Sequence, residues 1–243
     1  MAPAASRRAG AASSGAIFGG KIQGYNDAFD FTGGNRPGPI LQVLNNVFLG
    51  SDDDLLDFDS TDAWVEGNIF LHVHRNGSPD SASAVSGGAD NADTSQITIV
   101  GNLFYDVDHA ANAKQGNFYT LLNNTIVHQT KIGSQDTNTA VVILADQNDQ
   151  GTFTVQGAGM VLEGNIILDA ENLTRNVTTA LVTYTNNLIH QLTGAPWTGP
   201  GGGNVNADPL LTRIPPFSET LNFNSWEAAQ VMWDYFQIGR AHV

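Results

Sequence analysis

Five aspartates within a short stretch form the densest group of acidic residues in the chain: Asp52, Asp53, Asp54, Asp57 and Asp59. Two carboxylates about 5 Å apart repel each other by roughly 1 kcal/mol in water and by about 3 kcal/mol at an effective dielectric constant of about 20. Several together must therefore raise their pKa values, bind a cation or remain in open solvent. Because Ca²⁺ prefers oxygen ligands, Asp54, Asp57 and Asp59 are candidate Ca²⁺ ligands. The alternative is a solvated turn, in which Asp is common.

A short pattern that recurs along the chain predicts how these side chains are positioned. In each copy Gly or Asn precedes an Asn, and an apolar residue follows two positions after it; the six Asn residues are Asn46, Asn68, Asn102, Asn124, Asn165 and Asn187. Their spacings are 22, 34, 22, 41 and 22 residues. The equal spacings indicate a coil of 22 residues. The longer ones indicate loop-like insertions near residues 78–94 and 131–152.

Between these Asn residues the apolar side chains alternate with a period of two, as in the stretch from Gln96 to Val100, which is typical of strands. A unit of this length cannot bury its inner face alone, but stacked units can. Stacked coils lie about 4.8 Å apart, so the Asn amides, which both donate and accept, can form a ladder of hydrogen bonds. The 26 Gly and 23 Asn residues disfavour helices. The predicted fold is all-β, a right-handed parallel β-helix. Leucine-rich repeats would need regular Leu positions, and propeller blades would be about twice as long.

These repeats resemble those of right-handed parallel β-helix repeat proteins of the pectate-lyase-like superfamily, over about residues 16–211. The segment from Gly203 to Leu210, GNVNADPL, resembles the GN…ADPL motif that closes such solenoids. The resemblance implies a groove on one outward sheet and a carbohydrate-active protein. The architecture alone fixes no activity, since it hosts lyases, hydrolases and adhesins.

The two ends of the chain are expected to lie outside the solenoid. Residues 1–15 have no apolar core of a signal peptide and are expected to be a disordered or fragmentary N-terminus. Residues 212–237 form an extension in which Asn224 to Phe236 could be a short capping helix, with Asn224 and Glu227 as a capping box. The last six residues, IGRAHV, match one reading frame of a sequencing adapter, so we expect a metagenomic fragment with a non-native end at 238–243.

Alignment of the coils converts sequence offsets into columns of side chains. Four residues after the anchoring Asn, imidazoles alternate with carboxylates: His72, Asp106, His128 and Asp169. Six residues after it come Asp52, His74, Asp108, Thr130 and Glu171. We interpret this edge as a polar turn whose side chains hydrogen-bond between coils. A metal or catalytic role is the alternative, because neutral His is a good transition-metal ligand.

A second set of columns lies on the next strand of each coil. With apolar neighbours pointing inward, Asp30, Asp57 and Asn112 form one outward column, and Thr32, Asp59 and Lys114 form the next. The resemblance to pectate-lyase-like enzymes implies that such an outward sheet carries the groove.

The most specific hypothesis is a Ca²⁺-dependent polysaccharide lyase acting on uronate polymers. Lys114 and Arg75 are the candidate base and charge stabiliser, and His74 or His109 could assist them. Carboxylates around Lys114 favour its protonated form, so an ion pair with Asp59 is the alternative role for this residue. Asn112, Trp64 and Tyr119 are candidate substrate contacts.

Two other functions remain open from the residues alone. A glycoside hydrolase could pair Asp54 with Asp57 or Asp59. A non-catalytic surface, adhesion or carbohydrate-binding scaffold would stack sugars on aromatic rings such as Trp64, Tyr105 or Tyr119.

Charge and composition restrict the partners. The net charge of −14, from 10 basic and 24 acidic residues, disfavours nucleic acid. The chain has no Cys, which excludes disulfides and thiolate metal sites. No run approaches the roughly 20 apolar residues of a membrane span. We therefore expect a monomeric bacterial protein, secreted or at the cell surface, whose partner is a polysaccharide or a cell-surface glycan.

Overall fold

The computed structural model describes residues 16–17, 27–32, 40–48, 50–75, 82–89, 93–129, 135–145, 155–175, 177 and 180–212. Almost all of the terminal segments discussed above, the proposed capping helix and parts of both predicted insertions lie outside these residues. Within the described residues every element is a strand. None of these elements is an apolar helix that could cross a membrane.

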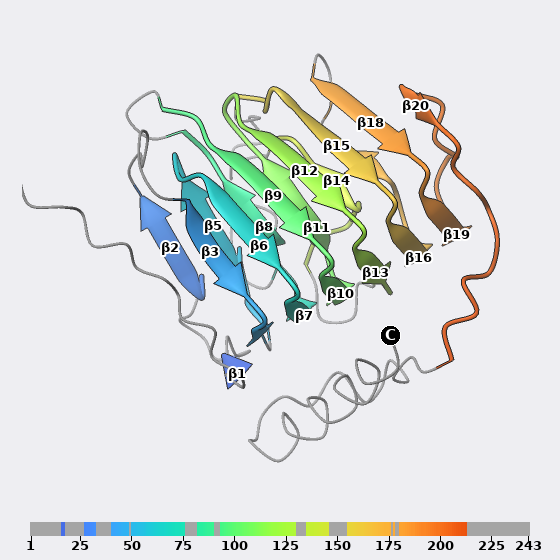
Figure 1. The fold of residues 1–243 in the computed structure, drawn as a ribbon, viewed down its shortest axis with the longest axis horizontal. Helices are drawn as coiled ribbons and strands as arrows, with labels where there is room; N and C mark the ends of the chain where they lie inside the picture. Colours follow the sequence, from blue (N-terminus) through green and yellow to red (C-terminus); the bar gives the residue numbers. More distant parts are fainter. Residues whose placement is uncertain are drawn as a thin grey trace, which may run out of the picture.

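The strands form three parallel sheets that stack coil upon coil, so the chain is an all-β parallel β-helix (Figure 1). Sheet A contains β1 (Ala16–Ile17), β4 (Val47–Phe48), β7 (Ile69–Val73), β10 (Leu103–Val107), β13 (Thr125–Val127), β16 (Ile166–Ala170) and β19 (Leu188–Leu192). Sheet B contains β2 (Phe29–Thr32), β5 (Leu56–Asp59), β8 (Ser83–Gly87), β11 (His109–Ala113), β14 (Val142–Ile143) and β17 (Thr174–Arg175). Sheet C contains β3 (Leu41–Leu44), β6 (Ala63–Glu66), β9 (Gln96–Val100), β12 (Phe118–Leu122), β15 (Gly159–Glu163), β18 (Leu181–Thr185) and β20 (Gly201–Gly202).

Each coil runs from sheet C through sheet A to sheet B, and its register matches the sequence spacing. Leu103 of β10 pairs with Thr125 of β13, and Ile166 of β16 pairs with Leu188 of β19. Both pairs are separated by 22 residues. The longer spacings contain strands as well as loops: the buried strand β8 lies within the predicted insertion at 78–94, and β14 lies within the one at 131–152. The prediction that both stretches are exposed loops is therefore wrong where these strands pair in sheet B.

The predicted Asn ladder is confirmed at the turn between sheets C and A. Asn102 Oδ1 accepts the backbone N–H of Asn68 at 2.8 Å and its side-chain amide at 3.0 Å. The same geometry continues from Asn46 to Asn187 and ends on Asn204. The residue before each Asn has a positive φ, for example 60° at Gly101 and 53° at Asn123. This left-handed conformation explains why only Gly or Asn precedes the anchor.

The core is a stack of apolar side chains that point into the solenoid. Phe48, Phe70 and Phe104 stack on successive coils, with ring centroids 5.1 and 4.8 Å apart. A second buried apolar cluster, packed against Leu211, is made by Val47, Ile69, Leu71, Tyr105, Val127 and Leu168. These side chains alternate with the inward ones along sheet A, so they lie on its outer face. Sheet A is therefore largely buried on both faces at β7 and β10, and so is sheet B at β8 and β11.

Candidate functional site

Sheet B carries a polar column on its outward face at the N-terminal end of the solenoid. The strand register aligns Asp30 with Asp57, Asp57 with Ser86, and Ser86 with Asn112. The predicted column is therefore confirmed, and Ser86 occupies the coil that the sequence alignment had left out. The buried Leu56 and Phe58 flank Asp57 in β5 and point inward, which is why Asp57 faces out.

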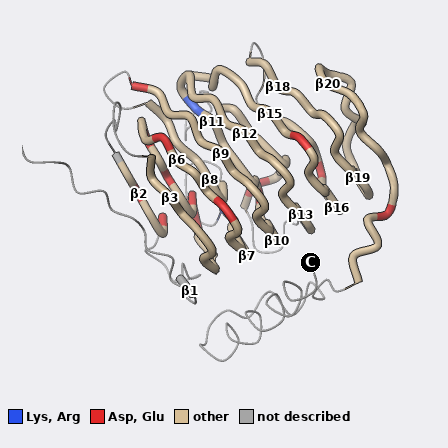
Figure 2. Tube along the Cα trace, viewed as in Figure 1, with Lys and Arg blue, Asp and Glu red and all other residues tan. Residues whose placement is uncertain are grey.

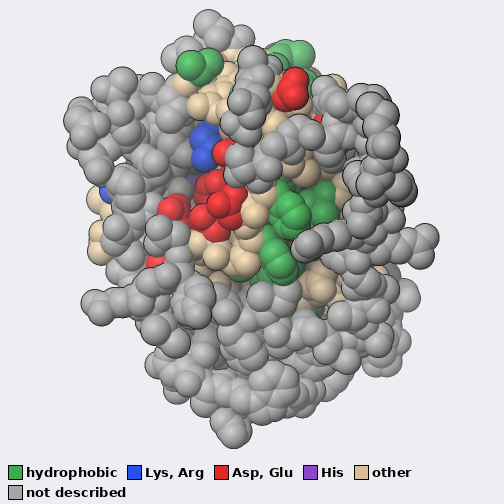
Figure 3. All heavy atoms as spheres, turned by 90° about the vertical axis from the view of Figure 1, so that its left-hand side faces the viewer, with side chains coloured by type: hydrophobic (Ala, Val, Ile, Leu, Met, Phe, Trp, Pro, Cys, Tyr) green, Lys and Arg blue, Asp and Glu red, His purple; other side chains and the backbone are tan. Residues whose placement is uncertain are grey.

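Acidic side chains gather around one lysine at this end, and we call Asp27, Asp30, Asp53, Asp57 and Asp59 the acid cluster. Burial raises the pKa of Asp27 to about 7, and the neighbouring Asp53, Asp57 and Asp30 add to this rise. Burial likewise raises the pKa of Asp57 to about 6, while Lys114 opposes the rise and Asp59 adds to it. Viewed from the β2 end, acidic side chains lie beside a basic one (Figure 3). Acidic positions outnumber basic ones along the described solenoid (Figure 2).

The three predicted Ca²⁺ ligands differ in how their oxygens are engaged. Asp54 is buried; its Oδ1 accepts the Ser83 N–H at 2.8 Å and its Oδ2 lies 3.6 Å from Lys114 Nζ. Asp59 Oδ1 accepts the Gly88 N–H at 2.5 Å. Asp57 Oδ1 is buried and has no hydrogen-bond partner within the described structure. Asp57 is thus the carboxylate best placed to take a cation, while Asp54 holds β8 and Lys114 in place.

Lys114 lies where the columns predicted, but its ion-pair partner is Asp54 rather than Asp59. Asp54 stands at the start of β5 and its carboxylate reaches across to the coil of Lys114. Arg75 follows β7, and the Ser51–Val73 bridge places it in the coil next to Asp53. Lys114 borders the acid cluster, because its charge acts on the carboxyls of Asp27 and Asp57, whereas Arg75 is placed near Asp53 only by the register of its coil.

The candidate substrate contacts are not brought together. Asn112 lies in the polar column but is 0% exposed. Tyr119 is a core residue, also 0% exposed, and its hydroxyl donates to the Gly87 carbonyl at 3.4 Å. The prediction that Tyr119 stacks on a sugar is wrong for this conformation, because strand β12 points its ring inward. Trp64 is 37% exposed on sheet C, a different sheet, where its Nε1 donates to Glu66 at 2.7 Å.

His109 is buried at the start of β11, away from solvent. Its Nε2 lies 3.1 Å from Asp136 Oδ2, and its Nδ1 lies 2.9 Å from the Ala140 carbonyl. Asp136 also pairs with Arg175 at 2.9 Å. Although burial acts against ionisation, the bonds from His109 and Arg175 hold the pKa of Asp136 well below its usual range. This network ties the second insertion to sheet B, and its buried imidazole is not placed to assist a substrate.

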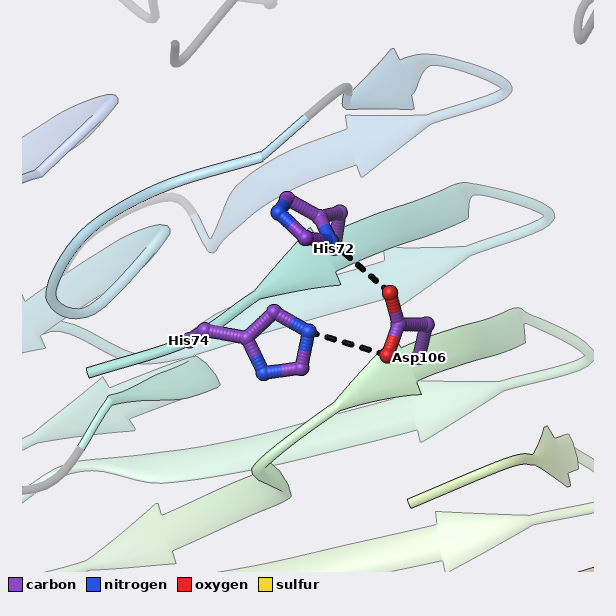
Figure 4. A group of neighbouring side chains, drawn as sticks. All are labelled: His72, His74 and Asp106. Atoms are coloured by element: carbon purple, nitrogen blue, oxygen red, sulfur yellow. Dashed lines mark hydrogen bonds and ion pairs between the residues drawn. The ribbon is translucent and has the colours of Figure 1, made fainter. Parts of the chain in front are cut away.

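His74 belongs to a second buried group, the histidine–aspartate cluster, made by His72, His74, Asp106 and Asp108. His72 Nδ1 lies 2.7 Å from Asp106 Oδ2, and His74 Nε2 lies 2.9 Å from Asp106 Oδ1 (Figure 4). His74 Nδ1 lies 2.7 Å from Asp108 Oδ1. Burial lowers the pKa of His74, but the bonds to Asp106 and Asp108 outweigh it and raise that pKa to about 9.

These contacts confirm the interpretation of this edge as a turn that hydrogen-bonds between coils. His72, Asp106, His128 and Asp169 all have φ of 57° or 58°. Asp and His are among the residues that tolerate this left-handed conformation, which explains the column's composition. His128 and Asp169 repeat the pairing at 2.6 Å farther along the solenoid.

Sequence reasoning missed Asp27 and Asp136 as members of these groups. Asp27 stands three residues before Asp30, just as Asp54 stands three residues before Asp57. That shared offset could have revealed it. Asp136 lies within the second insertion, where the repeat is interrupted, so the sequence pattern carries no signal for it.

The best-formed cavity, of about 420 Å³, lies at the other end of the solenoid, away from the acid cluster. Its lining includes Leu173, Ile189, Leu192 and Trp197. Trp197 packs on Tyr184 with ring centroids 4.6 Å apart. We interpret this cavity as the partly covered end of the apolar core, because its apolar lining continues the inward stack.

Comparisons with known proteins add no family to this picture. No protein-family model matches the chain, and neither a curated protein nor a solved structure matches it. The parallel β-helix architecture is therefore shown by the stacked sheets alone.

Proposed function

We propose that this chain is a carbohydrate-active β-helix protein that binds a uronate-containing polysaccharide through Ca²⁺ at the acid cluster, and that it cleaves the polymer by elimination. The observation that carries the proposal is the buried Asp57 Oδ1, which lacks a hydrogen-bond partner within the described structure and lies among other carboxylates. A location outside the cell or at its surface belongs to the same proposal.

The charge of the site favours a cation as the bridge to substrate. Asp53, Asp57 and Asp30 add to the rise in the pKa of Asp27, and a bound cation would relieve this repulsion. Ca²⁺ takes six to eight oxygen ligands, including carboxylates. An anionic sugar would otherwise be repelled by a chain with a net charge of −14.

The position of Lys114 beside Asp54 and Asp57 supports an elimination mechanism. Ca²⁺, when bound, would neutralise the uronate carboxylate and make the proton on the neighbouring carbon more acidic. Lys114, the candidate base, would accept that proton. The electron pair forms the new C=C bond as the glycosidic C–O bond breaks, and the leaving oxygen takes up a proton. Lys114 can serve as a base only when a cation offsets the field of Asp54 and Asp57.

A non-catalytic glycan-binding scaffold is the second candidate. It is favoured by the burial of Asn112, His74 and His109 and by the ion pair that occupies Lys114. A hydrolase is a third, because the raised pKa values of Asp27 and Asp57 would let one carboxyl act as an acid near neutral pH.

One set of assays separates these functions. The protein is incubated with pectate, alginate and glycosaminoglycans, with Ca²⁺ or with a chelator. Absorbance of the unsaturated product, new reducing ends and polymer binding are all measured. Unsaturated product that requires Ca²⁺ supports the lyase. Reducing ends without unsaturation indicate a hydrolase, and binding alone indicates a scaffold; either result overturns the elimination step. If none of the three measurements gives a signal with any polymer, the whole proposal is overturned.

Two variants locate the activity on sheet B. Asp57→Asn should abolish the Ca²⁺-dependent signal, because it removes the charge nearest the proposed cation. Glu163→Gln, which makes the same charge change at an exposed position of sheet C, should leave it unchanged.

A further inference from the structure

The histidine–aspartate cluster joins two adjacent coils at the end of sheet A. His72 and His74 come from the end of β7, and Asp106 and Asp108 occupy the matching positions of β10. Both imidazoles point toward the Asp106 carboxylate (Figure 4). The left-handed φ at His72 and Asp106 bends each chain here, which brings the two histidines of β7 around one carboxylate of the neighbouring coil.

The spacing of these groups fits a small divalent ion. One ligand atom each from His72, His74 and Asp106 lies within 4.8 Å of the other two. Zinc binds imidazole nitrogen and carboxylate oxygen at about 2.0–2.2 Å. Tetrahedral ligands at that bond length stand roughly 3.3–3.6 Å apart, so the present nitrogen–oxygen distances of 2.7 and 2.9 Å need to open by less than about 1 Å.

Asp108 supplies the support that metal-binding histidines usually have. Its Oδ1 lies 2.7 Å from His74 Nδ1, and its Oδ2 accepts the Arg75 N–H at 2.8 Å. This fixes the imidazole so that Nε2 faces Asp106. A carboxylate behind a metal-bound imidazole orients the ring and makes it a stronger ligand.

We propose that His72, His74 and Asp106 form a buried binding site for one divalent transition metal ion of the Zn²⁺ type, with Asp108 as the positioning residue. The ligands are at most 3% exposed, so the ion would link the coils of β7 and β10 structurally. Imidazole ligands select transition metals over Ca²⁺. The site is therefore independent of the Ca²⁺ site proposed at the acid cluster.

Nitrogen–oxygen contacts hold the cluster together without an ion. His72 and His74 face Asp106, and His74 also faces Asp108, so a hydrogen between each nitrogen–oxygen pair holds the metal-free cluster together. Metal binding must displace protons from between the imidazoles and Asp106. Titration calorimetry in buffers of different ionisation enthalpy should therefore show proton release.

The test uses the whole chain, stripped with a chelator and dialysed against Zn²⁺ or Co²⁺. We expect about one ion per chain by elemental analysis, a rise in Tm, and visible Co²⁺ bands from nitrogen ligands. His72→Ala should abolish binding, and Asp108→Asn should weaken it by about 10–100-fold. His128→Ala is the matched control, because His128 pairs with Asp169 at 2.6 Å in the same column but is not one of the proposed ligands.

Three results would overturn the site: no bound ion in the wild-type chain, binding unchanged by His72→Ala, or equal losses in His72→Ala and His128→Ala. If His72→Ala does not fold, the site is still tested by the Co²⁺ spectrum of the wild-type chain and by the metal affinity of Asp108→Asn. Ca²⁺-dependent activity is measured in parallel, so failure of one site is distinguishable from failure of the other.

Discussion

Replacing Asn102 by Ala tests how strongly the Asn ladder holds the coils together. Asn102 Oδ1 accepts the backbone N–H of Asn68 at 2.8 Å, and its Nδ2 donates to the Val65 carbonyl and to Asn124 Oδ1, both at 3.0 Å. The substitution leaves the Asn68 N–H without its acceptor and the Val65 carbonyl without the Asn102 side-chain donor. The backbone N–H at position 102 still donates to Asn124 Oδ1. A buried polar group that loses its partner costs about 1–3 kcal/mol. We therefore expect Asn102→Ala to lower the free energy of unfolding by about 3 kcal/mol.

Asn204, at the end of the ladder, provides the matched comparison. Its Oδ1 accepts a hydrogen bond from the Asn187 N–H at 3.0 Å. Because this bond is only half-buried, water can replace it when the side chain is removed. Asn204→Ala should cost about 1 kcal/mol. Both variants are unfolded with urea, and unfolding is followed by circular dichroism. Equal slopes of the free energy of unfolding against urea concentration would show that both variants expose the same surface on unfolding. A cost for Asn102→Ala below about 1 kcal/mol, or no larger than that for Asn204→Ala, would refute this account of the ladder.

Three other predictions concern stability. The pKa of His74 is about 9 in the folded protein and about 6.5 in the unfolded chain. Protonation of His74 therefore stabilises the folded state fully below the unfolded pKa, and this stabilisation is lost as pH rises through about 9. In chelator, the stability difference between wild type and His74→Gln should shrink by about 3 kcal/mol from about pH 6 to about pH 10; a constant difference in urea titrations would contradict this. Asp57 has a folded pKa of about 6 against about 4 when unfolded, so its ionisation opposes folding above pH 6. In chelator, Asp57→Asn should therefore gain about 2 kcal/mol relative to wild type between about pH 4 and about pH 8, and no gain would contradict the raised pKa. Gly87→Ala should cost about 3 kcal/mol, because its Cβ would lie 2.4 Å from the Phe58 carbonyl oxygen, whereas Gly101→Ala, with φ of 60° but open space around it, should cost about 1 kcal/mol; equal Tm losses would contradict that reasoning.

The fold could be predicted because each coil repeats the same physical requirement. An Asn at one turn must hydrogen-bond to the Asn above and below it, so its position marks the register. The hydrogen bond of the ladder survives even where the spacing between coils is longer, as between Asn68 and Asn102. The residue before each anchoring Asn must adopt a left-handed φ. This explains why the position is filled by Gly, as at Gly67, or by Asn, as at Asn123.

The site was predicted less completely, because side-chain partners depend on burial that a repeat does not encode. The outward column through Asp57 follows from strand alternation and is confirmed. The partner of Lys114 is Asp54 rather than Asp59, since the choice depends on how far each carboxylate reaches between coils. Tyr119 could be placed on either face from its sequence alone, and its strand turns it inward.

Ca²⁺ titration into the chelator-stripped protein, followed by calorimetry, tests the proposed function most directly. The account predicts saturable binding in the wild type and in Glu163→Gln, and loss of that binding in Asp57→Asn. Absence of Ca²⁺ binding in the wild type, or binding that Asp57→Asn leaves intact, would contradict the assignment of a cation to the acid cluster.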